Sequence, residues 1–329
     1  NFTNSLLVGT DSTGTLSSAD GNTGVGVGVF SALTSGDSNV AVGLNALNDN
    51  TTGIQNTALG FKTLCANTTA SGNIAVGAFS LQTNTEGLSN VAVGTCQPSG
   101  YGAALELNTT GDCNVAVGNG ALRSNTTANN NTAVGTLALG CTTTGAENTS
   151  VGKQALQVNT TGVSNVAVGV CALQNATTVN NNTAVGTCAM QATTTGANNT
   201  AVGFSALDTN TTGCENVVVG RDTMFSGTTA CRGVAVGYRA LKDVTTGSNN
   251  VAVGFCALKA NTTGVDNTAV GCGALCTNTT ASANTALGRA ALRLNTTGDD
   301  NVALGRNAMC SNTTASNNIS IGHEAMCTN

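Results

Sequence analysis

Hydrophobic and polar residues recur along this chain with a fixed 17-residue period. The stretch from Asn250 to Asp266 reads NVAVGFCALKANTTGVD, and the same order of residue types begins again at Asn267. With its places numbered 1 to 17, the unit is N-(T/V)-A-V-G-x-x-A-L-x-x-N-T-T-G-x-x. Self-similarity at a fixed period indicates a repeat architecture in which each copy packs on its neighbours.

The glycine at unit position 5 marks 19 copies of the unit. Successive glycines keep the period, except that the interval from Gly94 to Gly118 is longer by seven residues. Position 4 is Val, Leu or Ile in all 19 copies, position 9 is Leu or Met in 17, and position 1 is Asn in 17. Residues 95–101 are therefore an insertion, which we expect to bulge as a loop at a turn without breaking the array.

The unit predicts one coil of a parallel β-solenoid. Positions 1 to 5 are short, alternating and rich in β-branched residues, as strands are. Asn-Thr-Thr-Gly at positions 12 to 15 is turn chemistry. A second short strand is expected around the Ala-Leu pair at positions 8 and 9. We therefore expect a single all-β domain over residues 1–329, with 19 coils stacked about 4.8 Å apart.

The core of such a stack follows from the same pattern. Val at position 4 and Leu at position 9 are expected to stack on themselves, with Ala at positions 3 and 8 keeping the layers close. Asn at position 1 is expected to form a ladder of side-chain hydrogen bonds, an arrangement that also stabilises cross-β assemblies. An isolated coil buries too little to fold, whereas many stacked coils are stable.

Composition and charge exclude several functional classes. Aromatic residues make up 3% of the chain, charged residues 8%, and the net charge is −5 with no basic run. Nucleic-acid binding favours clustered cations and stacking rings, so no nucleic-acid partner is expected. No apolar run approaches the ~20 residues of a membrane span, so membrane insertion is not expected either. Without an initiator Met or a signal peptide, we expect a processed chain or an excerpt of a longer one.

Several of the 13 cysteines occupy matching positions of adjacent units. Four pairs lie in adjacent copies at equal or neighbouring positions: Cys171 and Cys188, Cys214 and Cys231, Cys256 and Cys272, and Cys310 and Cys327. Neighbouring coils about 4.8 Å apart fit the Cα separation of a disulfide. These pairs are therefore disulfide candidates, which favours an oxidising, extracellular setting. The alternative is that Cys replaces Ala or Ser at tolerant sites. The odd total also allows a bond between chains.

Asn-Thr-Thr at the polar turn is formally an N-glycosylation acceptor. Glycans there would line one edge of the solenoid; the alternative is that the motif is simply the turn this coil needs. The candidates are Asn50, Asn67, Asn108, Asn125, Asn159, Asn210, Asn261, Asn278, Asn295 and Asn312. Stacked Thr at positions 13 and 14 also suggests ice binding, which uses flat outward arrays of threonine. Adjacent Thr residues on a strand point to opposite faces, so only one of the two could form an outward file.

No catalytic constellation is present in the sequence. His323 is the only His, there is no CxxC, and the acidic residues are scattered over turn positions. We therefore expect no enzyme activity, no metal site of the zinc type and no cofactor.

The block Asn-Val-Ala-Val-Gly-x-x-Ala, as in Asn165 to Ala172, resembles the head repeats of trimeric autotransporter adhesins and repeats of phage and viral tail-fibre shafts. The resemblance covers nearly the whole chain on about eight residues per unit. It implies a left-handed β-roll, three chains side by side and exposure on a cell or virion surface. This chain departs from the family in its longer unit, its Asn-Thr-Thr turn and its cysteines.

The function expected from these observations is structural: an extracellular, non-enzymatic fibre or adhesin shaft that associates with copies of itself. One alternative is a monomeric solenoid that polymerises head to tail, because the two ends of the chain nearly continue the period. A second is an ice-binding solenoid. A third is recognition of a surface receptor or glycan through the insertion at residues 95–101.

Overall fold

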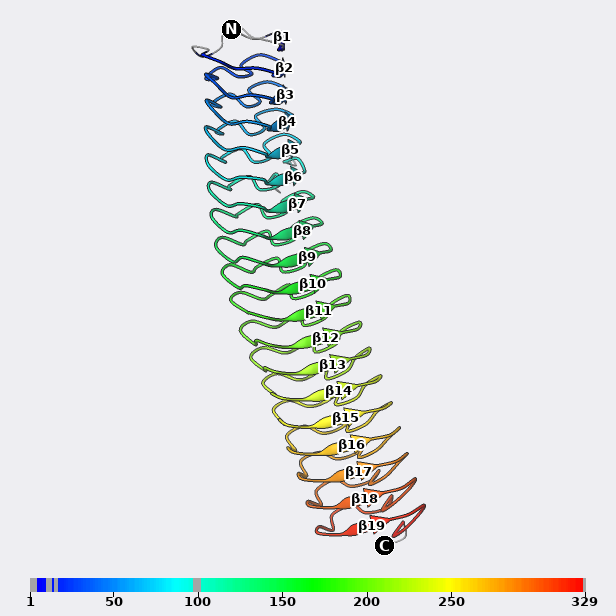
Figure 1. Cartoon of the computed structure of the whole chain (residues 1–329). Coiled ribbons are helices and arrows are strands. Elements are labelled where there is room, and N and C mark those ends of the chain that lie inside the picture. The colour runs from blue at the N-terminus through cyan, green and yellow to red at the C-terminus, as the bar shows by residue number, and fades with distance from the viewer. Residues whose placement is uncertain (1–4, 10–13, 15–16, 97–101, 328–329) are drawn as a thin grey trace. The chain divides into compact units, whose positions relative to one another are not determined.

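The structure is a computed structural model and describes residues 5–9, 14, 17–96 and 102–327. In these residues the chain is all-β, a parallel β-solenoid of 19 strands with a 17-residue spacing and no helix. The chain divides into two compact units, Asn1–Asn165 and Val166–Asn329. Each unit is a stack of coils in which the strands follow one another in chain order (Figure 1).

Each coil contributes one strand of three residues, at unit positions 2 to 4. The first unit contains β1 (Leu6–Val8), β2 (Thr23–Val25), β3 (Val40–Val42), β4 (Thr57–Leu59), β5 (Ile74–Val76), β6 (Val91–Val93), β7 (Val115–Val117), β8 (Thr132–Val134) and β9 (Thr149–Val151). The second unit contains β10 (Val166–Val168), β11 (Thr183–Val185), β12 (Thr200–Val202), β13 (Val217–Val219), β14 (Val234–Val236), β15 (Val251–Val253), β16 (Thr268–Val270), β17 (Thr285–Leu287), β18 (Val302–Leu304) and β19 (Ile319–Ile321).

The insertion leaves the stack in register. Strand β6 pairs in parallel with β7, and Val91 lies opposite Val115 although the connection between the two strands is longer than elsewhere. Most of the inserted loop, residues 97–101, lies outside the described residues. The prediction that the array continues across the insertion is confirmed.

The apolar core is narrower than the sequence pattern predicts. The middle residue of most strands, usually Ala at position 3, is fully buried, whereas the aliphatic residue at position 4 faces outward; Val219, for example, is 38% exposed. Placing position 4 in the core was wrong, because adjacent residues of a strand point to opposite faces. Leu or Met at position 9 is the single large apolar side chain that most coils bury, beside Ala at positions 3 and 8.

Two coils show how closely the core volumes are matched. Where Phe30 replaces Leu at position 9, Gly24 replaces Ala at position 3, and a Cβ on Gly24 would lie 3.1 Å from the Phe30 ring. Where Met224 stands at position 9, Gly233 replaces Asn at position 1 of the next coil. A Cβ on Gly233 would lie 3.1 Å from the Met224 methyl carbon. In these two coils, glycine makes room for the side chain at position 9, in keeping with close packing.

The expected second strand is absent from the described coils. Positions 7, 9 and 17 take positive φ, as in Cys256 (53°), Leu258 (49°) and Asp266 (58°). None of the described non-glycine residues with positive φ is β-branched, in keeping with the poor tolerance of such residues for this conformation. The turns still bond to the next coil: the Leu258 N–H donates to the Ala274 carbonyl at 3.0 Å.

Two ladders of buried asparagines run inside the coils. At position 1, Asn199 donates its Nδ2 to the Asn182 Oδ1 at 3.2 Å and to the Gly213 carbonyl at 2.9 Å. This confirms the predicted ladder. A second ladder, at position 12, links Asn67 to the Asn50 Oδ1 at 2.9 Å. Where Thr142 replaces Asn in this second ladder, the Asn125 Oδ1 is left buried without a hydrogen-bond partner.

Candidate functional site

The outward side of the strands carries a regular file of exposed apolar side chains in each unit. We call the outward side chains at positions 2 and 4 the strand face. Position 2 is mostly Val or Thr, and position 4 is Val, Leu or Ile throughout. Its exposed aliphatic members include Val25, Val42, Leu59, Ile74, Val93 and Val151 in the first unit, and Val202, Val217, Val219, Leu287, Leu304, Ile319 and Ile321 in the second.

One of the predicted disulfides is present in the structure. Cys310 and Cys327 are bonded, with their Cα atoms 4.9 Å apart. Both residues occupy position 10 of adjacent coils, so the bond links equivalent places in the stack. The in-phase spacing of the two cysteines was sufficient to identify this pair.

The Cys214 and Cys231 thiols lie only 2.7 Å apart at position 16 of adjacent coils. Their hydrogen bond, together with burial, raises the pKa of Cys214 to about 11. We expect mild oxidation to join the two sulfurs and to stabilise the fold by about 3 kcal/mol, the value for closing a loop of this length. Because the thiolate is the attacking species, the rate of oxidation should rise as the pH approaches the raised pKa of Cys214.

Mass spectrometry of alkylated, non-reduced digests checks this expectation. A linked peptide pair containing Cys214 and Cys231 should appear, while the exposed Cys113 and Cys141, which have no in-phase partner, serve as accessible controls. Alkylation of Cys214 and Cys231 to the same extent as Cys141 after oxidation would contradict it.

The other two cysteine pairs stay predictions. Burial raises the pKa of Cys188, and the neighbouring Asp208 and Cys171 add smaller contributions in the same direction. Cys256 and Cys272 instead open onto one pocket, which they share with Cys276. Cys276 has no in-phase partner and was not among the predicted pairs. Cys276 occupies position 10, which lies on the same side of the coil as positions 6 and 7. The recurrence of these three positions in adjacent coils could have identified the group of Cys256, Cys272 and Cys276.

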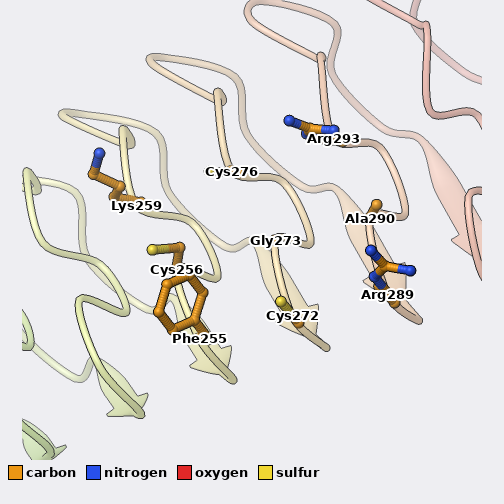
Figure 2. A pocket seen from close by; sticks show the side chains of 9 residues that line it. All are labelled: Phe255, Cys256, Lys259, Cys272, Gly273, Cys276, Arg289, Ala290 and Arg293. Atoms are coloured by element: carbon orange, nitrogen blue, oxygen red, sulfur yellow. The ribbon is translucent and has the colours of Figure 1, made fainter.

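This pocket, which we call the Cys272 pocket, is a surface hollow of about 320 Å³ in the second unit. Three successive coils, which follow β15, β16 and β17, each contribute positions 6, 7 and 10. Its lining residues are Phe255, Cys256 and Lys259, then Cys272, Gly273 and Cys276, then Arg289, Ala290 and Arg293. Figure 2 shows Lys259 on one side of the hollow, Arg289 and Arg293 on the other, and Cys272 between them.

The hollow exists because the middle coil has glycine at position 7. A Cβ added to Gly273 would meet nothing within 4 Å. Burial raises the pKa of Cys256 and of Cys276, and nearby cations such as Lys259 only partly oppose this effect. Both thiols are therefore neutral near pH 7, and the charge of the pocket comes from its Lys and two Arg residues.

The predicted glycosylation sites lie inside the coils rather than along an exposed edge. Nine of the ten sequon asparagines are 0% exposed and Asn312 is 6% exposed. Asn261, for example, donates its Nδ2 to the Gly264 carbonyl at 2.9 Å. Glycosylation at these residues stays a prediction; in the folded coil, the Asn261 amide that would carry a glycan is the one that closes the turn.

Threonines of the polar turn divide into an inter-coil file and an outward file. Thr262, at position 13, donates its hydroxyl to the Thr279 carbonyl of the next coil at 3.0 Å, whereas Thr263, at position 14, is exposed. The turn thus presents one exposed file of threonines and not a flat array of two, although these residues lie in a bend and not in a strand.

Other candidate chemistry is scattered. His323 lies 3.5 Å from Glu324 on the surface, and no group of three His, Cys, Asp or Glu residues in the described part of the chain is arranged to hold a metal ion. Within the same residues, no helix could span a lipid bilayer.

Comparison of the chain with protein-family models and with curated protein sequences finds no match. The fold is therefore what characterises it: a parallel β-solenoid built from a 17-residue unit.

Proposed function

We propose that this chain is a structural, non-enzymatic module of an extracellular fibre or adhesin shaft, and that copies of it associate side by side through the strand face. The observation that carries the proposal is the unbroken file of aliphatic residues at position 4, which the fold leaves pointing outward. Contiguous apolar surface of this kind marks an interaction site.

The size of the strand face supports this assignment. Ten coils of the second unit, with three strand residues each, present roughly 480 Å², and nine coils of the first unit present roughly 430 Å². A stable interface buries about 800 Å² per partner, so the strand face of each unit by itself supplies roughly half of this value. The Cys310–Cys327 disulfide supports the extracellular setting.

Sedimentation velocity tests the proposal. The unmodified chain should sediment as a closed oligomer, a trimer if the adhesin-like arrangement holds, rather than as a 32.2 kDa monomer. The double variant Val202→Lys/Val219→Lys places two charges on the strand face and should sediment as a folded monomer, because burying an unpaired charge is strongly unfavourable.

A matched control uses the exposed threonine file of the same region. Thr195→Lys/Thr212→Lys adds the same charge at position 14 and should leave the oligomer intact. An unmodified chain that remains monomeric at micromolar concentration would overturn the proposal. An open-ended series of species that the strand-face variant leaves unchanged would favour head-to-tail polymerisation instead.

A further inference from the structure

The Cys272 pocket gathers three cationic side chains from nearby coils in one hollow. Lys259, Arg289 and Arg293 line it without any acidic residue, and none of the three forms an ion pair within the described residues. Some cations elsewhere do have such partners: Arg123, Arg239 and Lys242 each form an ion pair with a nearby carboxylate. The pocket is thus a concave site whose positive charge is unbalanced.

The acidic residues of the same coils lie on a different turn. Asp266, Asp299 and Asp300 occupy positions 16 or 17. The carboxylates of Asp266 and Asp299 accept hydrogen bonds from the Asn249 Nδ2 and from the Ser282 backbone N–H. These acidic residues do not line the pocket. They therefore do not neutralise the charge of its three cations, which is left for a bound anion to neutralise.

Aromatic residues on one side of the pocket and arginines on the other continue into the neighbouring coils. Phe255 is 55% exposed, and its ring centroid lies 5.5 Å from that of Tyr238 in the preceding coil. On the other side, Arg306 follows Arg289 at position 6. Both the rings and the arginines thus occupy position 6 of adjacent coils, whose backbones are ~4.8 Å apart, which favours an elongated ligand with repeated anionic groups.

We propose that the Cys272 pocket binds a sulfated or carboxylated sugar unit of an acidic glycan. Arg289 and Arg293 present planar forks that match sulfate or carboxylate oxygens. Lys259 stands at the same unit position as Arg293 two coils away, where the backbones are about 9.6 Å apart, and meets a second anionic group. The Phe255 ring offers an apolar face to the sugar ring. The hollow of about 320 Å³ takes one such unit, and the neutral thiols of Cys256 and Cys276 do not repel an anion.

A nucleic acid is the competing polyanion, and the charge of the whole chain argues against it. The net charge is −5, so the long-range field repels a long uniformly charged duplex, whereas a small local site still attracts a short anionic segment. The pocket is separate from the strand face, so this binding does not depend on the proposed self-association.

Isothermal titration with a heparin-derived hexasaccharide in 50 mM NaCl tests the proposal. The unmodified chain should bind the hexasaccharide and not a neutral dextran of equal length. Arg289→Glu/Arg293→Glu should weaken binding at least 10-fold, since each lost charged contact is worth about one order of magnitude. The control Lys153→Glu/Arg232→Glu, with the same change in net charge outside the pocket, should bind within about 2-fold of the unmodified chain.

A second variant separates the hollow from its charge. Gly273→Phe fills the pocket without altering a cation, and Phe79 already occupies position 7 with a φ of 64°, so the substitution suits the backbone. It should also weaken hexasaccharide binding about 10-fold. Circular dichroism verifies that each variant is folded.

The proposal would be overturned by no binding by the unmodified chain, equal losses in the control and pocket variants, or unchanged affinity in Gly273→Phe. Binding of a single-stranded oligodeoxynucleotide of equal charge as tightly as the hexasaccharide would also overturn it, in favour of a nucleic-acid site.

Discussion

Asn199→Leu is expected to destabilise the second unit by roughly 3–6 kcal/mol, because it leaves several buried polar groups without partners. The two side chains are similar in size, so the loss is one of hydrogen bonds. The substitution removes the donor to the Gly213 carbonyl and the Oδ1 that accepts from both the Asn216 N–H and the Asn216 Nδ2, each at 3.0 Å. Each buried group left unsatisfied costs about 1–3 kcal/mol. Urea unfolding followed by circular dichroism measures the loss.

The neighbouring Asn198 provides the matched control. It is exposed, and Asn198→Leu should change the free energy of unfolding by no more than about 1–2 kcal/mol, the range for a residue with positive φ. If both variants unfold at the same urea concentration, the buried ladder does not carry the stability that we assign to it. Gly233 shows how the chain accommodates a missing rung: the Met224 side chain lies beside the vacant position.

Gly203→Ala is expected to open the stack locally between β12 and β13. Gly203 has a φ of 138°, and a Cβ on it would lie 2.5 Å from the carbonyl oxygen of Gly220 in the next coil. Because the obstructing atom is backbone, relief requires the coils to separate. Strain of about 1–3 kcal/mol adds to overpacking of about 1–3 kcal/mol. Hydrogen exchange should show faster exchange for amides of these coils, since each repeat is coupled mainly to its neighbours.

Gly273→Ala is the control for that experiment. Gly273 also has positive φ, at 67°, but its added Cβ meets nothing within 4 Å. We expect a change of about 1–2 kcal/mol from the backbone conformation alone. Equal exchange rates in the two alanine variants would show that close approach between coils is not what requires glycine at position 5.

The period, the parallel stacking, the asparagine ladder and one disulfide could be predicted because each depends on equivalent residues meeting at one coil spacing. The direction of position 4 was not predicted correctly. Val219 and Met224 are both apolar, and only the alternation about the buried Val218 shows that Val219 points outward. Exposed aliphatic residues look like core residues in a sequence, because apolar side chains are not confined to the interior.

The expected second strand failed for a different reason. Leu is a poor indicator of left-handed backbone, yet Leu258 and its equivalents hold φ near 49°. Tertiary packing overrides the preference of leucine for negative φ at this position. The side chain has to enter the core while the backbone N–H donates a hydrogen bond to the next coil. The near absence of β-branched residues at positions 7, 9 and 17 was the available signal. The Cys272 pocket was missed because its lining comes from three coils at three different positions.

The uniform register of the ladders also restricts how the gene can change. Insertion or removal of a whole block of 17 codons returns every asparagine, leucine and glycine to an equivalent neighbour, and changes the length of a stack by one rung of about 4.8 Å. Any other number of residues has to be accommodated outside the ladder, and β6 and β7 stay in register although the interval between them is seven residues longer. The length of a stack therefore changes only in whole coils. Recombination between repeats can add or remove a coil and leave the fold unchanged.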